Sequence, residues 1–415
     1  MIRRVRRKRI PEKQKYAHQF AKVTEEAVRI APRCQHFGHC GGCTLQDLDY
    51  ADQMAAKRQV FWRLIGKLKV RWALRGIMPE VEASAEPFGY RQRMDFVFAF
   101  GKSGMRGSGF DDVVDLQECH LVGAPGWRAF SRARELAVAA GIPDYDYLAH
   151  AGQLRYAVLR CNRAGEVLLA LVTRDRDHDA QLEQVAQTLL AEGLVVGVHH
   201  LINEARRDSS MGASVRHWGQ EQIEERIDEL RFLIGPNTFF QANPAIAERA
   251  YRHIADWLAP LKPTLGLDLY SGTGTIAAIL SRSCQRVIAV ENNPHNQAPA
   301  EANFAANGIT NIDYRLEDVA VFLKTFTEPV DALVLNPPRG GVGAKALAPI
   351  IALGPERIAY MSCNALTLLE DCRTLGPHYQ PAAIWVLDMF PQTRHFEVLI
   401  CFEKRVAELD DPAGD

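Results

Sequence analysis

Residues 265–275 read Leu265-Gly266-Leu267-Asp268-Leu269-Tyr270-Ser271-Gly272-Thr273-Gly274-Thr275, and this stretch decides the fold. An apolar strand runs into a glycine-rich turn that opens a helix. Glycine there lets the backbone turn sharply and approach a ligand without a Cβ in the way. Glu291 ends the next expected strand, 23 residues after Asp268, where a carboxylate can accept hydrogen bonds from ribose hydroxyls. Together the two features indicate a nucleoside cofactor.

The pattern around this stretch is regular from about residue 235 onward. Apolar segments alternate with helical ones, which predicts a parallel sheet with crossover helices. Two strand-like segments, 382–388 and 396–402, end the pattern like the antiparallel pair that closes a Rossmann-like methyltransferase sheet. We therefore predict an α/β protein with a Rossmann-like class I methyltransferase domain over residues 236–405. Its other expected strands are 265–269, 286–291, 312–315, 331–335 and 357–361.

The preceding sequence divides into three parts. Residues 1–33 hold eleven Lys or Arg against three acids, a charge of +8, which predicts a flexible basic arm suited to phosphate contacts. A loop rich in Cys and Gly follows at 34–43. Residues 44–235 are interpreted as a mixed, β-rich central domain that binds RNA. The last ten residues, 406–415, are expected to be an acidic tail.

Composition narrows the class of protein further. The chain has 415 residues, 47% of them hydrophobic, which is enough for a large core. No apolar stretch approaches the roughly 18 to 20 residues of a membrane span, and no secretory signal is evident. Nine cysteines are an odd count, so they favour reduced thiols, metal ligands or catalysis over a disulfide framework. We expect a cytoplasmic monomer that does not contact membranes.

The glycine-rich turn favours one nucleoside cofactor over another. It lacks the third glycine of G-x-G-x-x-G because Ala277 stands there, and Asp268 precedes the loop as in S-adenosylmethionine enzymes. We therefore expect S-adenosylmethionine rather than a dinucleotide. Asn336-Pro337-Pro338-Arg339 follows another apolar strand, where the two prolines restrict the turn and direct the Asn336 amide above the sheet.

A thiol stands where the methyl acceptor would lie. Cys363 follows the apolar strand 357–361, at a carboxyl end where open α/β sheets bind their ligands. A thiolate there can add to C6 of a uracil ring and make C5 reactive towards a methyl donor. A base must then remove the C5 proton, and we assign that role to Glu397. The alternatives are a buried apolar thiol and a surface carboxylate, but the shared sheet edge favours catalysis.

Four other cysteines form a candidate metal site. Cys34, Cys40 and Cys43 are clustered, and Cys119 would come from a distant segment. Nearby glycines leave backbone amides free to hydrogen-bond to sulfide. Four thiolates suit either zinc or an iron–sulfur cluster, and unbound thiols are a third possibility.

These motifs resemble those of the RNA uracil-C5 methyltransferases that carry a 4Fe-4S cluster. The likeness spans about residues 34–402. The resemblance implies an iron–sulfur loop, formation of 5-methyluridine, donor binding by Gln241, Tyr270, Glu291 and Asn336, catalysis by Cys363 and Glu397, and cluster ligands Cys34, Cys40, Cys43 and Cys119. Its pieces are the Cys34–Cys43 loop, 239–244 (FFQANP), the Asp268 turn, 335–339 (LNPPR), 362–365 (SCNA) and 388–391 (DMFP) with Glu397.

Two positions favour a branch of that family. Many relatives have Asp at the position of Asn336 and Pro at that of Ala365, and the variants here resemble the branch that acts on 23S rRNA. We therefore expect a role in rRNA processing. Three alternatives stay open: uridine-C5 methylation of tRNA, N-methylation of an exocyclic base amine, and a non-catalytic iron–sulfur protein that binds RNA.

Overall fold

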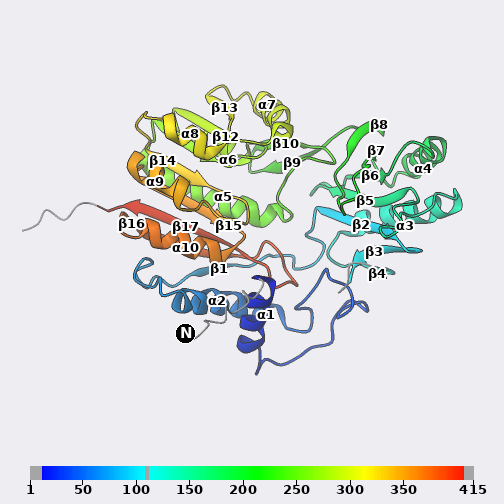
Figure 1. The fold of residues 1–415 in the computed structure, drawn as a ribbon, viewed down its shortest axis with the longest axis horizontal. Coiled ribbons are helices and arrows are strands. Elements are labelled where there is room, and N and C mark those ends of the chain that lie inside the picture. Colours follow the sequence, from blue (N-terminus) through cyan, green and yellow to red (C-terminus); the bar gives the residue numbers. More distant parts are fainter. Residues whose placement is uncertain (1–11, 108–111, 406–415) are drawn as a thin grey trace, which may run out of the picture.

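The fold, seen in a computed structural model that describes residues 12–107 and 112–405, is built around two separate sheets (Figure 1). The predictions for residues 1–11 and for the acidic tail 406–415 lie outside the described residues. No helix in the described ranges is long and apolar enough to cross a membrane.

The larger sheet has eight strands and confirms the predicted α/β class. Its central strands are parallel, and β17 runs antiparallel between β15 and β16. The order is β1 (Glu80–Glu82), β16 (Tyr379–Leu387), β17 (Glu397–Lys404), β15 (Arg357–Ser362), β14 (Ala332–Leu335), β11 (Leu265–Leu269), β12 (Arg286–Glu291) and β13 (Ile312–Leu316). The order of the parallel strands reverses at β11 and β14, the kind of position where such sheets bind ligands.

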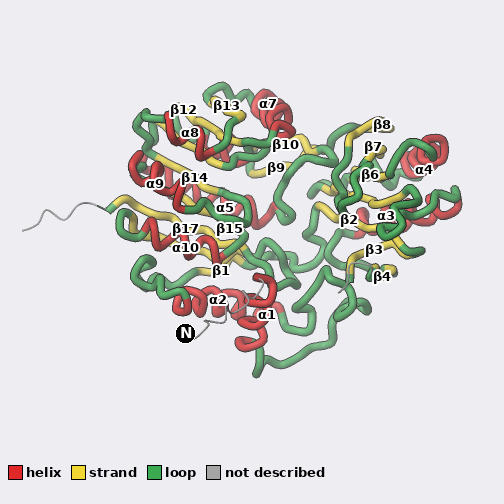
Figure 2. The backbone as a smooth tube through the Cα atoms, in the orientation of Figure 1, coloured by secondary structure: helices red, strands yellow, loops and turns green. Residues whose placement is uncertain are grey.

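Helices cover both faces of this sheet, as Figure 2 shows by the red segments on either side of the yellow strands. One core lies under α2 (Tyr50–Lys67), α8 (Val319–Thr325), α9 (Ala344–Leu353) and α10 (Ala365–Leu375). The other lies under α5 (Pro244–Leu258), α6 (Thr275–Leu280), α7 (Gln297–Ala306) and the hairpin of β9 (Ile223–Ile227) and β10 (Leu230–Ile234). Two short 3-10 turns, η1 (Ala259–Leu261) and η2 (Pro294–Asn296), lie in the connections.

The second sheet is mixed and has seven strands, which confirms the β-rich central part. Its order is β4 (Val113–Asp115), β3 (Lys102–Arg106), β2 (Arg93–Ala99), β5 (Leu154–Cys161), β6 (Val167–Thr173), β7 (Gly197–Ile202) and β8 (Ala213–Gly219). Helices α3 (Ala124–Ala139) and α4 (Asp179–Ala191) pack on one face. Residues 155–160 and 167–173 are buried along their whole length, so this sheet has a core of its own.

The sequence placed the start of the central domain at residue 44, but in the structure the segment after that residue packs on the larger sheet. Val60, Phe61 and Leu64 of α2 are buried in the core of the larger sheet. Further along the chain, β1 pairs in parallel with β16, with Val81 opposite Val386. Residues 50–82 therefore belong to the larger sheet, because the apolar face of α2 covers it.

Part of the expected flexible arm is a helix. Helix α1 (Glu12–Val23) packs on the same core as α2. Phe20 is 1% exposed, and the ring of Tyr16 meets that of Phe396 edge-on at 6.0 Å between centroids. Because Tyr16, Phe20 and Val23 recur at helical spacing, they give this polar segment one apolar face. Only residues 1–11 of the basic arm are left outside the described chain.

Candidate active site

Antiparallel pairing brings the predicted nucleophile and base together. Ser362, the last residue of β15, lies opposite Val398 of β17. The next residue on β15's path, Cys363, therefore comes beside Glu397. Both side chains line one cleft of about 720 Å³, which Gln241 also lines. That volume falls within the roughly 300 to 1,000 Å³ of typical ligand pockets.

Cys363 is half-buried, and its surroundings act on the thiol in opposite directions. Burial, and after it the negative charge of Glu397, raise the pKa of Cys363, whereas the charge and a hydrogen bond of Arg339 oppose that rise. A raised pKa keeps the resting group a thiol, and the thiolate is the reactive form. Arg339 is thus the neighbour that favours the thiolate. The sequence drew attention to Arg339 only as the last residue of the Asn336-Pro337-Pro338-Arg339 turn.

Glu397 has the environment of a general base. Its side chain is 5% exposed, and burial raises the pKa of its carboxyl to about 7. Within the described residues, Oε2 is buried and has no hydrogen-bond partner. A base is most effective when its pKa lies near the working pH, and its free oxygen must reach the proton. Glu397 meets the first requirement, and its side chain lines the cleft.

The same burial predicts a cost in stability that depends on pH. The folded pKa of Glu397 lies above its ordinary value of 4.5, so the folded state holds the proton more tightly than the unfolded state, and stability falls as pH rises from about 4.5 to about 7. We expect Glu397→Gln to raise the free energy of unfolding at pH 8 by up to about 3 kcal/mol. At pH 4 the gain disappears, because both states are protonated.

Denaturant unfolding of both proteins at the two pH values measures this difference. Glu403→Gln is the matched control, since Glu403 is a half-buried carboxylate on the same strand, β17. An equal effect of Glu397→Gln at pH 8 and pH 4 would show that the carboxylate carries no such penalty.

The loop that leads into Glu397, residues 388–396, is held in place by α2. Lys57 and Asp388 form a fully buried ion pair, and Tyr50 donates a hydrogen bond to Asp388 at 2.7 Å. Gln53 of the same helix donates from Nε2 to Oε1 of Gln392 at 2.9 Å and accepts from the backbone N–H of Gln392 at 3.1 Å. The position of the base therefore depends on a helix that lies more than 300 residues earlier in the chain.

The glycine-rich turn lies between β11 and α6, where the sequence predicted it. The backbone N–H of Gly272 donates to Glu291 at 2.9 Å, and Tyr270 adopts a left-handed conformation with φ 66°. Ser271 donates to Asp268 at 2.6 Å. Burial raises the pKa of Asp268 to about 7, an effect that the Ser271 bond opposes. Glu291 keeps a half-exposed carboxylate at the end of β12, where a ribose would reach it.

The glycine-rich turn lies next to the cleft that holds Cys363 and Glu397. Thr273 donates to the carbonyl of Phe239 at 3.2 Å, and Phe239 lines the cleft with Gln241. Asn336 follows β14 and is half-buried, with its backbone N–H directed to Leu269 at 3.4 Å. Tyr270, Glu291 and Asn336 thus stand at the carboxyl ends of three adjacent strands, and Gln241 lies on the cleft side.

One cleft residue was missed by sequence reasoning. Phe239 is 58% exposed, and it lines the cleft. The motif 239–244 was noticed as a whole, but a pattern of residues does not tell which of two adjacent aromatic rings is buried. Here Phe240 packs in the core and Phe239 faces the cleft.

The four predicted metal ligands also converge. Cys34, Cys40, Cys43 and Cys119 line one small cavity with apolar walls. Gln46 donates to the sulfur of Cys43 at 3.1 Å, and Gly42 donates to that of Cys40 at 3.4 Å. Over the described residues, no group of three or more His, Cys, Asp or Glu is arranged to hold a single metal ion. A four-iron cluster is larger than one ion, so its thiolates surround a volume instead of a point.

The fold and the donor site together define a class of enzyme. A parallel sheet with a glycine-rich turn after β11 and a carboxylate closing β12 is the architecture of S-adenosylmethionine-dependent methyltransferases. A crystal structure of the tRNA (uracil-54, C5)-methyltransferase of Pyrococcus abyssi with S-adenosyl-L-homocysteine superimposes with a TM-score of 0.76. It is 28% identical, and the match covers 90% of this chain and 85% of that one.

The chain belongs to the tRNA (uracil-5-)-methyltransferase family, whose profile matches residues 164–405. A tRNA (uracil(54)-C(5))-methyltransferase of Pyrococcus abyssi is 31% identical over 94% of this chain and 90% of its own length. An RNA methyltransferase of Caldanaerobacter subterraneus is 32% identical over 92% of this chain and 87% of its own length. The protein is therefore an S-adenosylmethionine-dependent RNA uracil-C5 methyltransferase.

Proposed function

We propose that this enzyme methylates C5 of a uridine in 23S rRNA, with Cys363 as nucleophile and Glu397 as base. The observation that carries the proposal is their adjacency in one cleft. S-adenosylmethionine, when bound, supplies the methyl group as a sulfonium electrophile. Gln241, Tyr270, Glu291 and Asn336 hold it, because they surround the strand ends beside that cleft.

The residues of the cleft supply the nucleophile and the base of the reaction. The Cys363 sulfur adds to C6 of the uracil, and Arg339 favours the thiolate that does so. C5 takes the methyl group from the donor, whose carbon–sulfur bond breaks so that S-adenosylhomocysteine leaves, and C5 then carries both the methyl group and its original hydrogen. Glu397 removes that hydrogen as a proton, the C5–C6 double bond reforms, and the sulfur leaves. The product is 5-methyluridine.

The central sheet is the part that we assign to RNA binding. Arg91, Arg93 and Arg160 line the cleft from this side. Arginine suits phosphate contacts, and a uridine must leave its stack before a thiol can reach C6. Arg93 is also held by Asp95 at 2.8 Å, so its guanidinium is fixed at the rim.

The proposal also names the kind of RNA that is methylated. One observation favours 23S rRNA and another favours tRNA. Asn336 and Ala365 are the variants that favour the 23S rRNA branch. The relatives from Pyrococcus are named for position 54 of tRNA, which favours tRNA as the second candidate.

Mapping 5-methyluridine in both RNAs from cells lacking this protein distinguishes these candidates. We expect one site in 23S rRNA to lose its methyl group while tRNA is unchanged. Loss confined to tRNA would establish the second candidate instead. Restoration by the wild-type gene, and not by a Cys363→Ala gene, is the control.

We also propose a 4Fe-4S cluster held by Cys34, Cys40, Cys43 and Cys119. Their common cavity and the N–H groups directed at two of the sulfurs support it. Gly41 supports it too: a Cβ there would stand 2.7 Å from the carbonyl of Arg106, so only glycine lets the loop close against β3. The cluster joins the loop at 34–43 to the segment between β4 and α3, which contributes Cys119.

Protein purified without oxygen is expected to be brown and to contain iron and sulfide in the ratio of such a cluster. Cys119→Ser should remove the visible absorption and lower stability, since metal binding is coupled to folding. Cys161→Ser is the matched control, because that thiol lies outside the cavity. A colourless protein containing zinc would contradict the proposal.

A further inference from the structure

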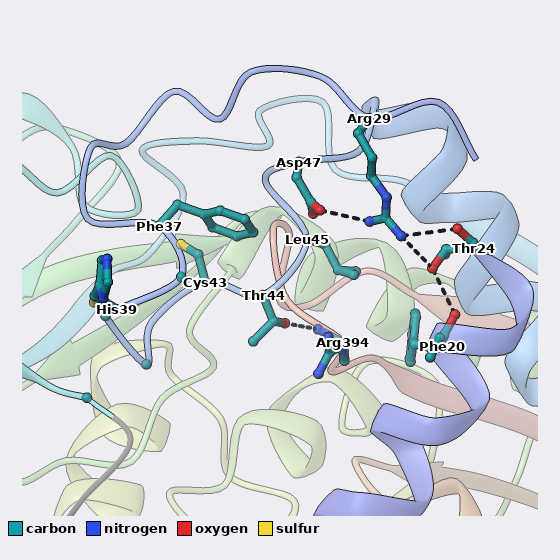
Figure 3. Close-up of a pocket in the computed structure, with 15 residues that line it drawn as sticks. Phe20, Thr24, Arg29, Phe37, His39, Cys43, Thr44, Leu45, Asp47 and Arg394 are labelled. Atoms are coloured by element: carbon teal, nitrogen blue, oxygen red, sulfur yellow. Dashed lines mark hydrogen bonds and ion pairs between the residues drawn. The ribbon is translucent and has the colours of Figure 1, made fainter. Parts of the chain in front are cut away.

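The loop at 388–396 borders a second pocket besides the catalytic cleft. Phe390 and His395 line the cleft, whereas Arg394 lines a pocket of about 490 Å³ between α1, the cysteine-rich loop and this loop. Figure 3 shows that pocket, with Arg394 beside Thr44 and below Leu45. Nothing in the methyl-transfer chemistry uses it, although Arg394 is only three residues from Glu397.

Of the two arginines that line this pocket, one is paired with a carboxylate and the other is not. Arg29 is neutralised there, since it pairs with Asp47 at 2.8 Å and donates to the carbonyl of Thr24 at 3.1 Å. For Arg394, only the backbone N–H is bonded, to the hydroxyl of Thr44 at 3.0 Å. Its guanidinium has no partner in the described chain, and its Nε is buried. A partly buried cation without a partner is costly, so the site favours an anion.

The remaining walls indicate more than a bare ion. Phe20, Leu45 and Phe37 give the pocket an apolar lining, and Phe37 is a half-buried ring. A cation and a partly exposed aromatic ring in one pocket are the combination with which proteins bind single-stranded nucleic acid, the cation for the phosphate and the ring for the base.

We infer that this pocket binds a nucleotide of the substrate RNA that neighbours the methylated uridine, with its phosphodiester against Arg394. The inference rests on the RNA methyltransferase function. Arg394 lies in the loop that leads directly into the base Glu397, the first residue of β17, so a phosphate held at Arg394 sets the register of the RNA strand relative to the cleft.

The inference has a quantitative consequence for binding. Each phosphate contact with a single strand contributes about 0.7 to the slope of log K against log salt. Loss of one contact should therefore weaken RNA binding about fourfold at roughly 0.15 M salt and make the slope shallower by about 0.7. A purely structural role of Arg394 would leave the slope unchanged.

The first experiment compares salt titrations of the holoenzyme with a 23S rRNA fragment that contains the mapped 5-methyluridine site. Arg394→Gln is expected to show the smaller slope, and Arg394→Lys is expected to restore it. The substitutions keep the backbone bond to Thr44. Arg128→Gln is the control, because Arg128 is an exposed arginine on α3 without an ion-pair partner among the described residues, and it is far along the chain from the loop. An unchanged slope in Arg394→Gln would overturn the inference.

The second experiment locates the contact. Single methylphosphonate linkages, which are uncharged, are placed at successive positions around the uridine. One linkage should weaken binding to wild type and to Arg128→Gln but not to Arg394→Gln. Equal sensitivity of all proteins at every linkage would contradict a phosphate contact.

If inorganic phosphate protects wild type but not Arg394→Gln from unfolding while both bind RNA equally, the pocket is a free-anion site and the inference is wrong. Failure of wild type to methylate the fragment would instead count against the proposed function.

Discussion

Cys363→Ala is expected to abolish methyl transfer, lowering the rate by about four orders of magnitude or more. Without sulfur at C6, uracil C5 is too weak a nucleophile to attack a sulfonium methyl group. Binding of the methyl donor should survive, because the donor residues lie on other strands. Single-turnover transfer of labelled methyl to RNA, with donor affinity measured separately, checks both expectations.

Cys372→Ala is the matched control for that variant. Cys372 is a fully buried thiol on α10, nine residues further along the chain, so its loss tests packing without touching the cleft. We expect it to keep substantial activity. Full transfer to C5 by Cys363→Ala would force us to abandon covalent catalysis, and an N-methylated product would establish the exocyclic-amine alternative.

Glu397→Gln is expected to halt the reaction after the methyl group has moved. The amide cannot accept the C5 proton, so the sulfur cannot leave and the enzyme stays bonded to methylated RNA. Turnover should fall roughly 10²- to 10⁴-fold, the usual contribution of a general base. A denaturing gel should show a protein–RNA complex with ordinary uridine RNA, which wild type shows only in trace amounts.

The control for trapping is the double variant Cys363→Ala with Glu397→Gln, which should give no complex. Glu403→Gln, on the same strand, should turn over normally. Release of free 5-methyluridine RNA by Glu397→Gln at the wild-type rate would mean that another group removes the proton.

The sequence was most informative where strands are fully buried. The predicted strands 265–269 and 286–291 match β11 and β12 residue for residue, because a continuous apolar run between turn signals leaves few alternatives. It was less informative about which sheet a helix covers. The apolar residues of α2 recur at helical spacing, yet the position of this helix on the larger sheet follows from tertiary packing, which local spacing does not encode.

The candidate active site likewise combines contacts that the sequence predicts with contacts that it does not. Cys363 and Glu397 follow or begin predicted strands, so their meeting could be inferred from sheet topology. The contact of Arg339 with Cys363 could not, because it depends on side-chain direction after a turn. The support of Gln392 by Gln53 joins residues 339 positions apart, and no pattern in either segment indicates it.

Covalent bonding between the enzyme and the pyrimidine is tested most directly with RNA that carries 5-fluorouridine at the methylated position. Fluorine at C5 cannot be removed as a proton, so the complex should accumulate, and proteolysis followed by mass spectrometry should place the nucleotide on Cys363. An adduct on any other cysteine, or methyl transfer to the analogue without an adduct, would contradict the mechanism.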